Sequence, residues 1–192
     1  MAYIFEYLRD WLGKEFFDRK FKEEESGIFY DLGSGTGKAV IAMSLFCPFK
    51  KLIGIEYLQG LWDLSVRSKA AYDKTIFDKH LKYSAIFTIE NTNKIEFYNG
   101  DFLRQNWNEA LIVFANSTCF SPYLMEKIGI KAMIECKAET ILITISKKLN
   151  NLNDDWECRN PFKRLMTWGV ASIYIYIRRK VTINKGENKL FD

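Results

Sequence analysis

The stretch FYDLGSGTGKAV, from Phe29 to Val40, decides the fold. An apolar run leads into three glycines, Gly33, Gly35 and Gly37, and a helix-like run follows them. A glycine-rich turn between a strand and a helix is where open α/β sheets bind nucleotides and related ligands. The fold class follows from this turn, and the residues around it identify the ligand.

Two common phosphate-binding motifs do not fit the spacing of these glycines. A P-loop needs a glycine five residues before Gly37 and a hydroxyl residue after the lysine, and these positions hold Leu32 and Ala39. The dinucleotide motif GxGxxG fails at its last position, which holds Lys38. The pattern that remains is D-x-G-x-G-x-G, which begins at Asp31. A carboxylate at this place suits a ligand with a cationic amino-acid end, such as S-adenosylmethionine.

Further polar residues stand where the next two strands are expected to end. Glu56 follows the second apolar run, about 20 residues after the turn, where a carboxylate can accept hydrogen bonds from both hydroxyls of a ribose. Asp101 and Phe102 follow the third run and offer an acceptor and an apolar wall for an adenine ring. Because the carboxyl ends of parallel strands meet at one edge, we expect Asp31, Glu56 and Asp101 to converge on one crevice that binds S-adenosylmethionine.

Strand-like and helix-like runs alternate from residue 27 to residue 149. Strands are expected at 27–33, 51–57, 94–102, 110–116 and 139–149, and helices at 37–47, 58–83 and 121–136. Residues 156–180 then hold two strand-like runs, joined near Trp168 and Gly169 without a helix between them. The expected fold is therefore α/β, a three-layer, Rossmann-like, seven-stranded class I methyltransferase sheet with five parallel strands plus a C-terminal antiparallel hairpin.

The chain of 192 residues fits one domain, with an N-terminal helical segment (1–26), a catalytic core (27–180) and a tail (181–192). Its residues are 48% hydrophobic, which suffices for a packed core, and no apolar run approaches the roughly 20 residues that span a bilayer. The first segment has apolar residues at helical spacing, which predict an amphipathic helix that covers the core. These residues are Ile4, Phe5, Leu8, Trp11 and Leu12.

The cysteine and histidine content argues against a metal site. The four cysteines are Cys47, Cys119, Cys136 and Cys158, no two of which form a CxxC pair. His80 is the only histidine. We therefore expect reduced thiols in an intracellular protein, nuclear or cytoplasmic, and no metal.

The net charge of +4 is unevenly distributed, with an excess of basic residues after Trp156. Such a cluster is compatible with contact with nucleic acid and equally with a solvated terminus. Its members are Arg159, Lys163, Arg164, Arg178, Arg179, Lys180, Lys185 and Lys189.

The fourth strand is expected to end at Asn116, in FANSTCFSP, where a methyl acceptor meets the cofactor in such folds. An enzyme that methylates the amine of adenine would show two prolines after this position. Ser117 and Thr118 stand there instead. Methylation of a nucleobase amine is therefore disfavoured.

Five segments together carry a family resemblance. They are DLGSGTGKAV (31–40), GIEYLQGL (54–61), GDFLRQNW (100–107), ANSTCFSP (115–122) and MTWGVASIYIYIRR (166–179). In order and spacing they resemble the disruptor-of-telomeric-silencing family of histone lysine methyltransferases, which are non-SET, class I enzymes that use S-adenosylmethionine. GDFL-x-x-x-W followed by N-x-x-x-F-x-P is the most specific part of the resemblance, which covers residues 29–180.

The resemblance implies methyl transfer to a protein lysine, in a histone or another protein, and assigns roles by matching position. The methionine end of the cofactor would contact Asp31, Gly33, Ser34, Gly35 and Gly37, the ribose Glu56, and the adenine Asp101 and Phe102. Asn116 would contact the cofactor and, with Phe120, border the lysine channel. We expect Ser117 in the same channel, with Tyr7 and Trp168 as further candidates. The channel is expected to favour loss of the lysine proton by desolvation, with water taking the proton.

The chain also departs from the family pattern. The second asparagine of the active-site motif is replaced by Ser117 and its aromatic residue by Thr118, and only a short segment precedes the first strand, where the family has a lid. Two alternatives therefore stay open: a methyltransferase of a small molecule or RNA, and a non-catalytic partner subunit with a methyltransferase fold. The sequence does not indicate an oligomeric state.

Overall fold

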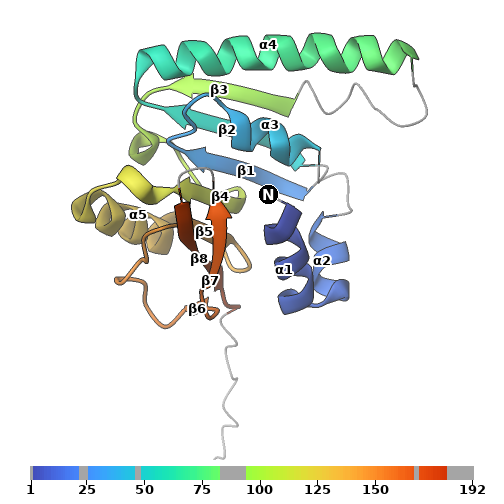
Figure 1. The fold of residues 1–192 in the computed structure, drawn as a ribbon. Coiled ribbons are helices and arrows are strands. Elements are labelled where there is room, and N and C mark those ends of the chain that lie inside the picture. The colour runs from blue at the N-terminus through green and yellow to red at the C-terminus, as the bar shows by residue number, and fades with distance from the viewer. Residues whose placement is uncertain (1, 22–25, 46–48, 83–93, 167–168, 181–192) are drawn as a thin grey trace, which may run out of the picture.

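The structure is a computed structural model that describes residues 2–21, 26–45, 49–82, 94–166 and 169–180. Five parallel strands form one side of a single sheet, in the order β3-β2-β1-β4-β5 (Figure 1). Their bounds are β1 Ser26–Leu32, β2 Phe49–Glu56, β3 Ile95–Asn99, β4 Ala110–Asn116 and β5 Ile141–Ile145. The predicted parallel pairing of these five strands is confirmed.

The C-terminal strands complete the sheet in antiparallel orientation. The strand β8 (Gly169–Arg178) pairs with β5 along one edge, and its other edge pairs with β6 (Trp156–Cys158) and β7 (Phe162–Met166). The predicted first hairpin strand is thus split in two at Asn160 and Pro161, because proline has no N–H to donate to a ladder. The chain stays attached at the break, where the N–H of Arg159 donates to the carbonyl of Ile175 at 3.1 Å.

In the described part of the chain, two α-helices precede β1, and three further α-helices and two 3-10 turns lie between later strands. The helices are α1 Ala2–Leu12, α2 Lys14–Phe21, α3 Lys38–Ser44, α4 Gln59–Lys82 and α5 Pro122–Glu135, and the turns are η2 Phe102–Arg104 and η3 Ser117–Cys119. The helix α5 begins at Pro122 after Ser121, whose hydroxyl accepts from the N–H of Leu124 at 3.1 Å, an N-cap that its sequence predicts. None of the described helices is both long and apolar enough to cross a membrane.

Several predicted boundaries differ from the structure, and two of these differences have a clear backbone cause. The fifth strand was expected to extend to residue 149, but β5 ends at Ile145, because Ser146 adopts a positive φ of 76° and turns the chain out of the sheet. The N-terminal segment forms two helices instead of one, since Gly13, with φ 81°, separates α1 from α2. Ile4 and Leu8 of α1 are buried, which confirms the predicted covering role for these two residues.

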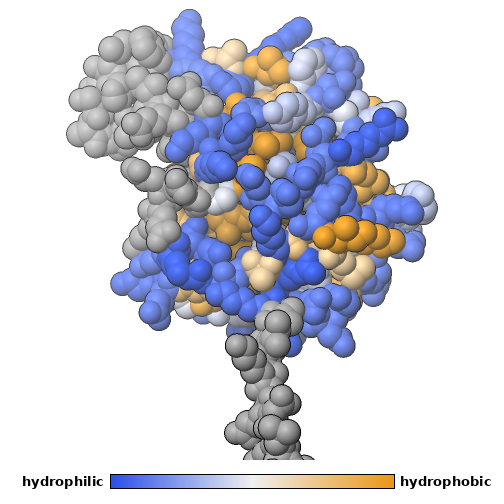
Figure 2. Space-filling view, turned by 180° about the vertical axis from the view of Figure 1, so that it is seen from behind, coloured by the Kyte–Doolittle hydropathy of each residue, from blue (hydrophilic) through white to orange (hydrophobic). Residues whose placement is uncertain are grey.

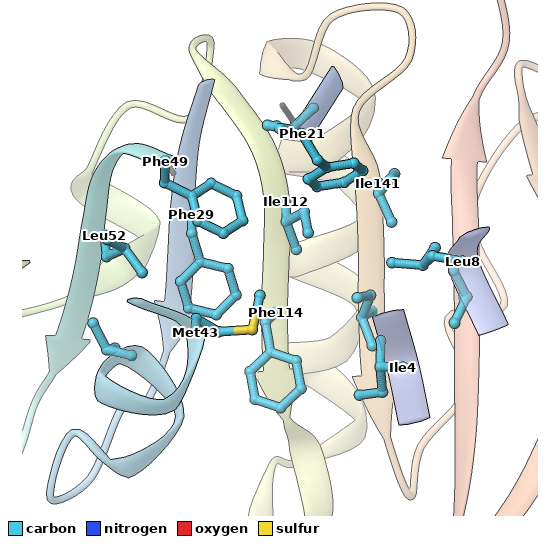
Figure 3. Close-up of a cluster of buried hydrophobic side chains, with 14 of the residues drawn as sticks. Ile4, Leu8, Phe21, Phe29, Met43, Phe49, Leu52, Ile112, Phe114 and Ile141 are labelled. Carbon is cyan, nitrogen blue, oxygen red and sulfur yellow. The ribbon is translucent and has the colours of Figure 1, made fainter. Parts of the chain in front are cut away.

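The sheet buries apolar side chains on both faces, as expected of parallel strands covered by helices. Along β4, Ile112 and Phe114 point to the face covered by α1, α2 and α3, where they meet Phe29 and Phe49 (Figure 3). The alternating residues of β4 point to the other face, which α5 covers in part. From behind, hydrophilic side chains predominate and hydrophobic ones form smaller areas between them (Figure 2). Apolar packing on both faces of the sheet therefore fixes the carboxyl ends of the parallel strands.

Candidate functional site

The predicted acidic residues lie at one edge of the sheet. Asp31 is the penultimate residue of β1, Glu56 is the last residue of β2, and Asp101 follows β3 after a single glycine. The carbonyl of Glu56 accepts hydrogen bonds from the N–H of Gly100 at 2.9 Å and from the side-chain amide of Asn99 at 3.0 Å. Glu56 and Asp101 are thus held side by side on neighbouring strand ends.

The glycine turn folds back onto the end of β2. The N–H groups of Gly33 and Ser34 both donate to the carbonyl of Ile55, at 2.9 and 3.0 Å. The N–H of Gly35 donates to Glu56 Oε2 at 2.8 Å, and the N–H of Leu58 donates to Glu56 Oε1 at 2.9 Å. One carboxylate therefore holds both the turn and the start of α4, and each of its oxygens retains a second lone pair that a ribose hydroxyl can use.

Sequence reasoning missed Phe97, whose ring fills the space beside two glycines. A Cβ atom on Gly37 would stand 2.8 Å from Phe97 Cε1, and one on Gly54 would stand 2.6 Å from Phe97 Cδ1. Gly37 also has a positive φ of 79°, so no side chain is tolerated there without strain. Alternation along β3 places Phe97 on the same face as Ile95, and this alternation is the sequence signal that could have identified Phe97 as an inward-facing residue.

Asp31 is a buried carboxylate for which the described residues provide no hydrogen-bond donor. Its exposed fraction is 2%. Desolvation, and then repulsion by Glu56, raise the pKa of Asp31 to about 7. The hydroxyl of Ser34 is likewise buried without a partner in the described part of the chain. Two polar groups lack partners next to Gly35, and no heavy atom lies within 4 Å of a Cβ placed on Gly35. This arrangement fits the close approach of a cationic ligand group.

A pocket of about 500 Å³ opens beside these groups. Its polar lining residues are Asp31, Ser34, Thr36, Lys38, Asn116 and Arg164. Large apolar side chains from several elements also line it, among them Ile4 of α1, Phe114 of β4, Ile145 of β5, Met166 of β7 and Ile173 of β8. The pocket therefore joins the glycine turn to the end of β4.

The adenine side of the predicted crevice is not part of this pocket. Glu56, Asp101 and Phe102 do not line it, because the ring of Phe120 lies between Gly33 and Phe102. A Cβ atom on Gly33 would stand 3.1 Å from Phe120 Cζ, and the rings of Phe120 and Phe102 stack with their centroids 5.7 Å apart. Phe120 thus stands between this pocket and Phe102, and the single crevice that joins Asp31, Glu56 and Asp101 stays a prediction.

The loop that carries Asp101 and Phe102 is fixed by its own contacts. Asp101 Oδ1 accepts from the N–H of Leu103 at 2.8 Å and so caps η2. Phe102 packs against the fully buried Trp107, and the N–H of Trp107 donates to Glu135 Oε2 at 2.8 Å. The side chains that were predicted to contact adenine therefore sit on a rigid support.

At the end of β4 the structure separates two neighbouring residues that were predicted to share a channel. Asn116 lines the pocket, and its Oδ1 accepts from the hydroxyl of Thr118 at 2.9 Å, which fixes the orientation of the amide. Ser117 is fully buried and points away: its hydroxyl donates to the carbonyl of Ile145 at 2.6 Å and accepts from the N–H of Lys147 at 3.3 Å. The placement of Ser117 in the channel is therefore corrected, because its hydroxyl is used to join β4 to the chain after β5.

Tyr7 and Trp168 were the two further candidates for the lysine channel. Tyr7 does not line the pocket: its ring stacks on Phe162 at 4.3 Å and its hydroxyl donates to the carbonyl of Asn160 at 3.3 Å. Trp168 lies outside the described residues, as do Cys47, Lys185 and Lys189. Cys119, Cys136 and Cys158 are free thiols.

We expect Ser117→Ala to lower the free energy of unfolding by about 1–3 kcal/mol, because it removes a buried hydroxyl and leaves two backbone groups without a partner. Chemical denaturation measures this change. If Ser117 acted on the acceptor, the alanine variant would instead keep its stability and lose turnover, an outcome that would restore the original prediction.

Comparison with known proteins identifies the chain's relatives. The family model described as histone methylation protein DOT1 matches residues 12–170. A curated protein of Caenorhabditis elegans, the histone-lysine N-methyltransferase specific for lysine 79 of histone H3, is 32% identical over 122 residues. The match covers 61% of this chain and 12% of that protein, so the chain spans only a small part of the relative's length.

Solved structures share the fold at low sequence identity. An RNA methyltransferase from Salinibacter ruber, in complex with S-adenosyl-L-homocysteine, has a TM-score of 0.55 and 17% identity, with 84% of this chain and 87% of that chain covered. A precorrin-6y C5,15-methyltransferase from Geobacter metallireducens has a TM-score of 0.55 and 9% identity, with 83% and 84% covered. Since these proteins are named for very different acceptors, the shared fold by itself does not identify an acceptor.

Proposed function

The chain belongs to the DOT1 histone methylation family, and from that premise we propose that it is an S-adenosylmethionine-dependent methyltransferase that acts on a lysine of a histone or another protein. The observation that carries the proposal is Asp31, a buried carboxylate without a described partner that lines an open pocket beside Gly35. Its environment suits the ammonium group of an amino acid, because a cation offsets the desolvation of the ionised carboxylate.

The residues present fit the proposed cofactor. Asp31 would hold the ammonium group, and Glu56, already oriented by Gly35 and Leu58, would accept from the ribose hydroxyls. Asp101 and Phe102 would hold the adenine, on the far side of Phe120. The cofactor, when bound, supplies a methyl group on a sulfonium, which is a good electrophile. The task of the chain is then to place a nucleophile about 3–3.5 Å from that carbon.

The pocket would also favour the neutral, nucleophilic form of a lysine amine. A lysine must lose a proton before it attacks, and its reference pKa is about 10.4. The apolar wall formed by Phe114, Ile145 and Met166 would disfavour the ammonium form and lower that pKa. Among the described residues that line the pocket, Asp31 is the only carboxylate, and the proposal commits it to the cofactor. Asn116 would orient the amine through its fixed amide, and water would take the proton.

A histone acceptor implies a nuclear protein, and we propose that location with it. The expected contact with nucleic acid through the C-terminal basic residues receives less support. Arg178, Arg179 and Lys180 pair with carboxylates at 3.8, 3.4 and 3.2 Å, so their charge is partly neutralised within the chain. Arg159, Lys163 and Arg164 are exposed and are the described members of the cluster that could reach a phosphate.

The proposal predicts that the protein transfers tritium from methyl-labelled S-adenosylmethionine to histones. Nucleosomes, free histones, histones with chemically blocked lysines, and total RNA are incubated with equal amounts of enzyme. Label on free histones or nucleosomes that disappears when lysines are blocked supports the proposal. Label on RNA would favour the alternative acceptor class. No label on any substrate, together with calorimetric binding of S-adenosylhomocysteine, would favour a non-catalytic subunit.

A further inference from the structure

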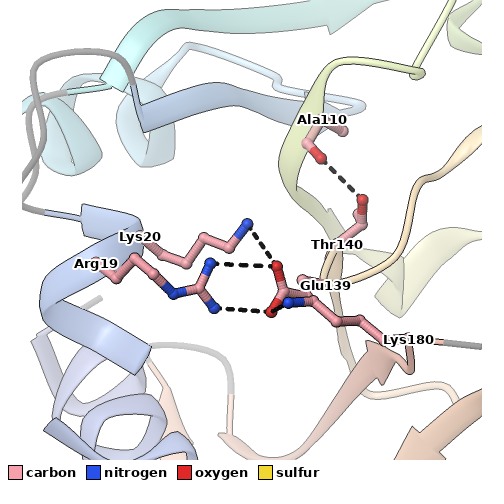
Figure 4. A network of polar contacts seen from close by, with 6 residues as sticks. All are labelled: Arg19, Lys20, Ala110, Glu139, Thr140 and Lys180. Atoms are coloured by element: carbon pink, nitrogen blue, oxygen red, sulfur yellow. Dashed lines mark hydrogen bonds and ion pairs between the residues drawn. The ribbon is translucent and has the colours of Figure 1, made fainter. Parts of the chain in front are cut away.

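A single carboxylate joins both ends of the described chain at the edge opposite to the pocket's glycine turn. Glu139 lies in the loop between α5 and β5 and receives Arg19 at 2.8 Å, Lys20 at 2.9 Å and Lys180 at 3.2 Å (Figure 4). Arg19 and Lys20 belong to α2, and Lys180 follows β8. Three cations from two distant segments of the chain thus meet on one carboxylate.

The charge of Glu139 is strongly stabilised. Burial alone would raise its pKa, but hydrogen bonds from Arg19, Lys20 and Lys180 outweigh that effect and lower the pKa to about 2. The side chain is only 14% exposed. At neutral pH the carboxylate is therefore always ionised, and dissolved salt, not a proton, is what can weaken the cluster.

The backbone around Glu139 is fixed independently of the ion pairs. Its φ is 71°, an uncommon conformation for a residue with a side chain. Its N–H donates to the carbonyl of Arg178 at 2.7 Å. The next residue, Thr140, donates from its hydroxyl to the carbonyl of Ala110 at 2.9 Å (Figure 4). The carboxylate is thus presented from the sheet at a defined place, to which α2 attaches.

The helix α2 connects the ion-pair cluster at Glu139 to the pocket through α1. It continues from α1 through Gly13, whose N–H and carbonyl keep bonds to Arg9 and Phe17. Ile4 of α1 lines the pocket, and the neighbouring turn of the same helix rests on β7 through the stacking of Tyr7 on Phe162. Displacement of α2 therefore moves one wall of the pocket.

We propose that Glu139 is a positioning residue that fixes α1 and α2 against the sheet, so that Ile4 closes the pocket and ionic strength modulates how tightly the pocket holds its ligand. The role is exerted at a distance, because Glu139 does not line the pocket. The expected change in ligand affinity rests on the proposed function, whereas the attachment of α1 and α2 to the sheet does not.

The test compares Glu139→Gln with Glu109→Gln. Glu109 lies near the same edge, and its described ion pair is with Lys50 of β2 at 3.1 Å and not with α2, so it is a control for the loss of one carboxylate. For Glu139→Gln we expect faster hydrogen exchange at the amides of α1 and α2 and a Kd for S-adenosylhomocysteine raised about tenfold, with the turnover at saturating cofactor little changed. The Kd of the wild type rises with salt, and that of the variant does not.

A second variant separates the attachment from a general loss of folding. Lys20→Gln alone is expected to reproduce part of the faster exchange, and adding it to Glu139→Gln is expected to change nothing further. Unchanged exchange in Glu139→Gln, or equal effects of Glu139→Gln and Glu109→Gln, would overturn the inference. If the wild type bound no S-adenosylhomocysteine, the proposed function would fail, while the exchange data would still decide whether Glu139 attaches the helices.

Discussion

The Asp31→Asn substitution is expected to weaken the binding of S-adenosylhomocysteine about 100-fold, because the variant leaves the ligand's ammonium group without its charged partner in a buried place. The same substitution is expected to stabilise the ligand-free protein at pH 8 by about 2 kcal/mol. Loss of binding with gain of stability is the signature of a residue retained for its ligand and not for the fold.

The sign of the stability change follows from the pKa of Asp31. Its value is raised from 3.8 in the unfolded reference to about 7 in the folded protein. Between these values the folded protein binds the proton that the unfolded chain releases, so stability falls as the pH rises through this window. At pH 8 the buried carboxylate is ionised and its cost is fully present. Asparagine removes that cost, which is why the gain disappears below pH 4.

The same ionisation predicts the pH dependence of binding. A cationic ligand needs ionised Asp31, and a group with a pKa of about 7 is mostly protonated at pH 6. The affinity of the wild type is therefore expected to increase about tenfold from pH 6 to pH 8, with release of a proton on binding. Calorimetry in buffers of different ionisation enthalpy measures both quantities, and the asparagine variant is expected to show neither.

A control shows whether these effects belong to Asp31 alone. Glu126 is an exposed carboxylate on α5, and Glu126→Gln is expected to change neither the stability nor the pH dependence of binding. An Asp31→Asn variant that lost stability at pH 8 and kept its affinity would show that the carboxylate supports the turn and does not hold a ligand. That outcome would remove the main support for the proposed function.

The sequence was sufficient for those features that depend on local patterns. The glycine turn, the order of strands and helices, and the acidic residues at strand ends could be predicted, because each rests on a few adjacent residues and on the geometry of parallel sheets. Asp31, Glu56 and Asp101 lie at the expected edge for this reason.

Features that depend on long-range packing could not be predicted in the same way. Ser117 turns inward because the carbonyl of Ile145, from a different strand, accepts its hydroxyl. Phe120 stands between the pocket and Phe102 because it packs against both Gly33 and Phe102, which come from separate loops. Glu139 meets Arg19 from 120 residues earlier in the chain, a pairing that leaves no periodic signal in the sequence. Local sequence patterns identify candidate site residues, and the packing around those residues decides which of them face the pocket.

Gly37→Ala is expected to cost about 3 kcal/mol of stability and to disrupt ligand binding, because two penalties act at one position. The first is the positive φ of 79°, and the second is a clash with the ring of Phe97, whose Cε1 atom would stand 2.8 Å from the new Cβ atom. Gly13 separates the two: its φ is 81°, but no heavy atom lies within 4 Å of a Cβ placed there. Gly13→Ala is therefore expected to cost only about 1 kcal/mol.

The double variant Gly37→Ala/Phe97→Leu tests the origin of the difference between these two glycines. A smaller, more flexible side chain at residue 97 relieves the clash, so the double variant is expected to lose less stability than the sum of the two single variants, with a coupling of about 1 kcal/mol or more. Urea denaturation of the four proteins gives the coupling directly. If Gly37→Ala cost no more than Gly13→Ala, or the two substitutions were additive, Phe97 would have no role in shaping the turn, and the geometry that places Gly35 and Glu56 around a ligand would need another support.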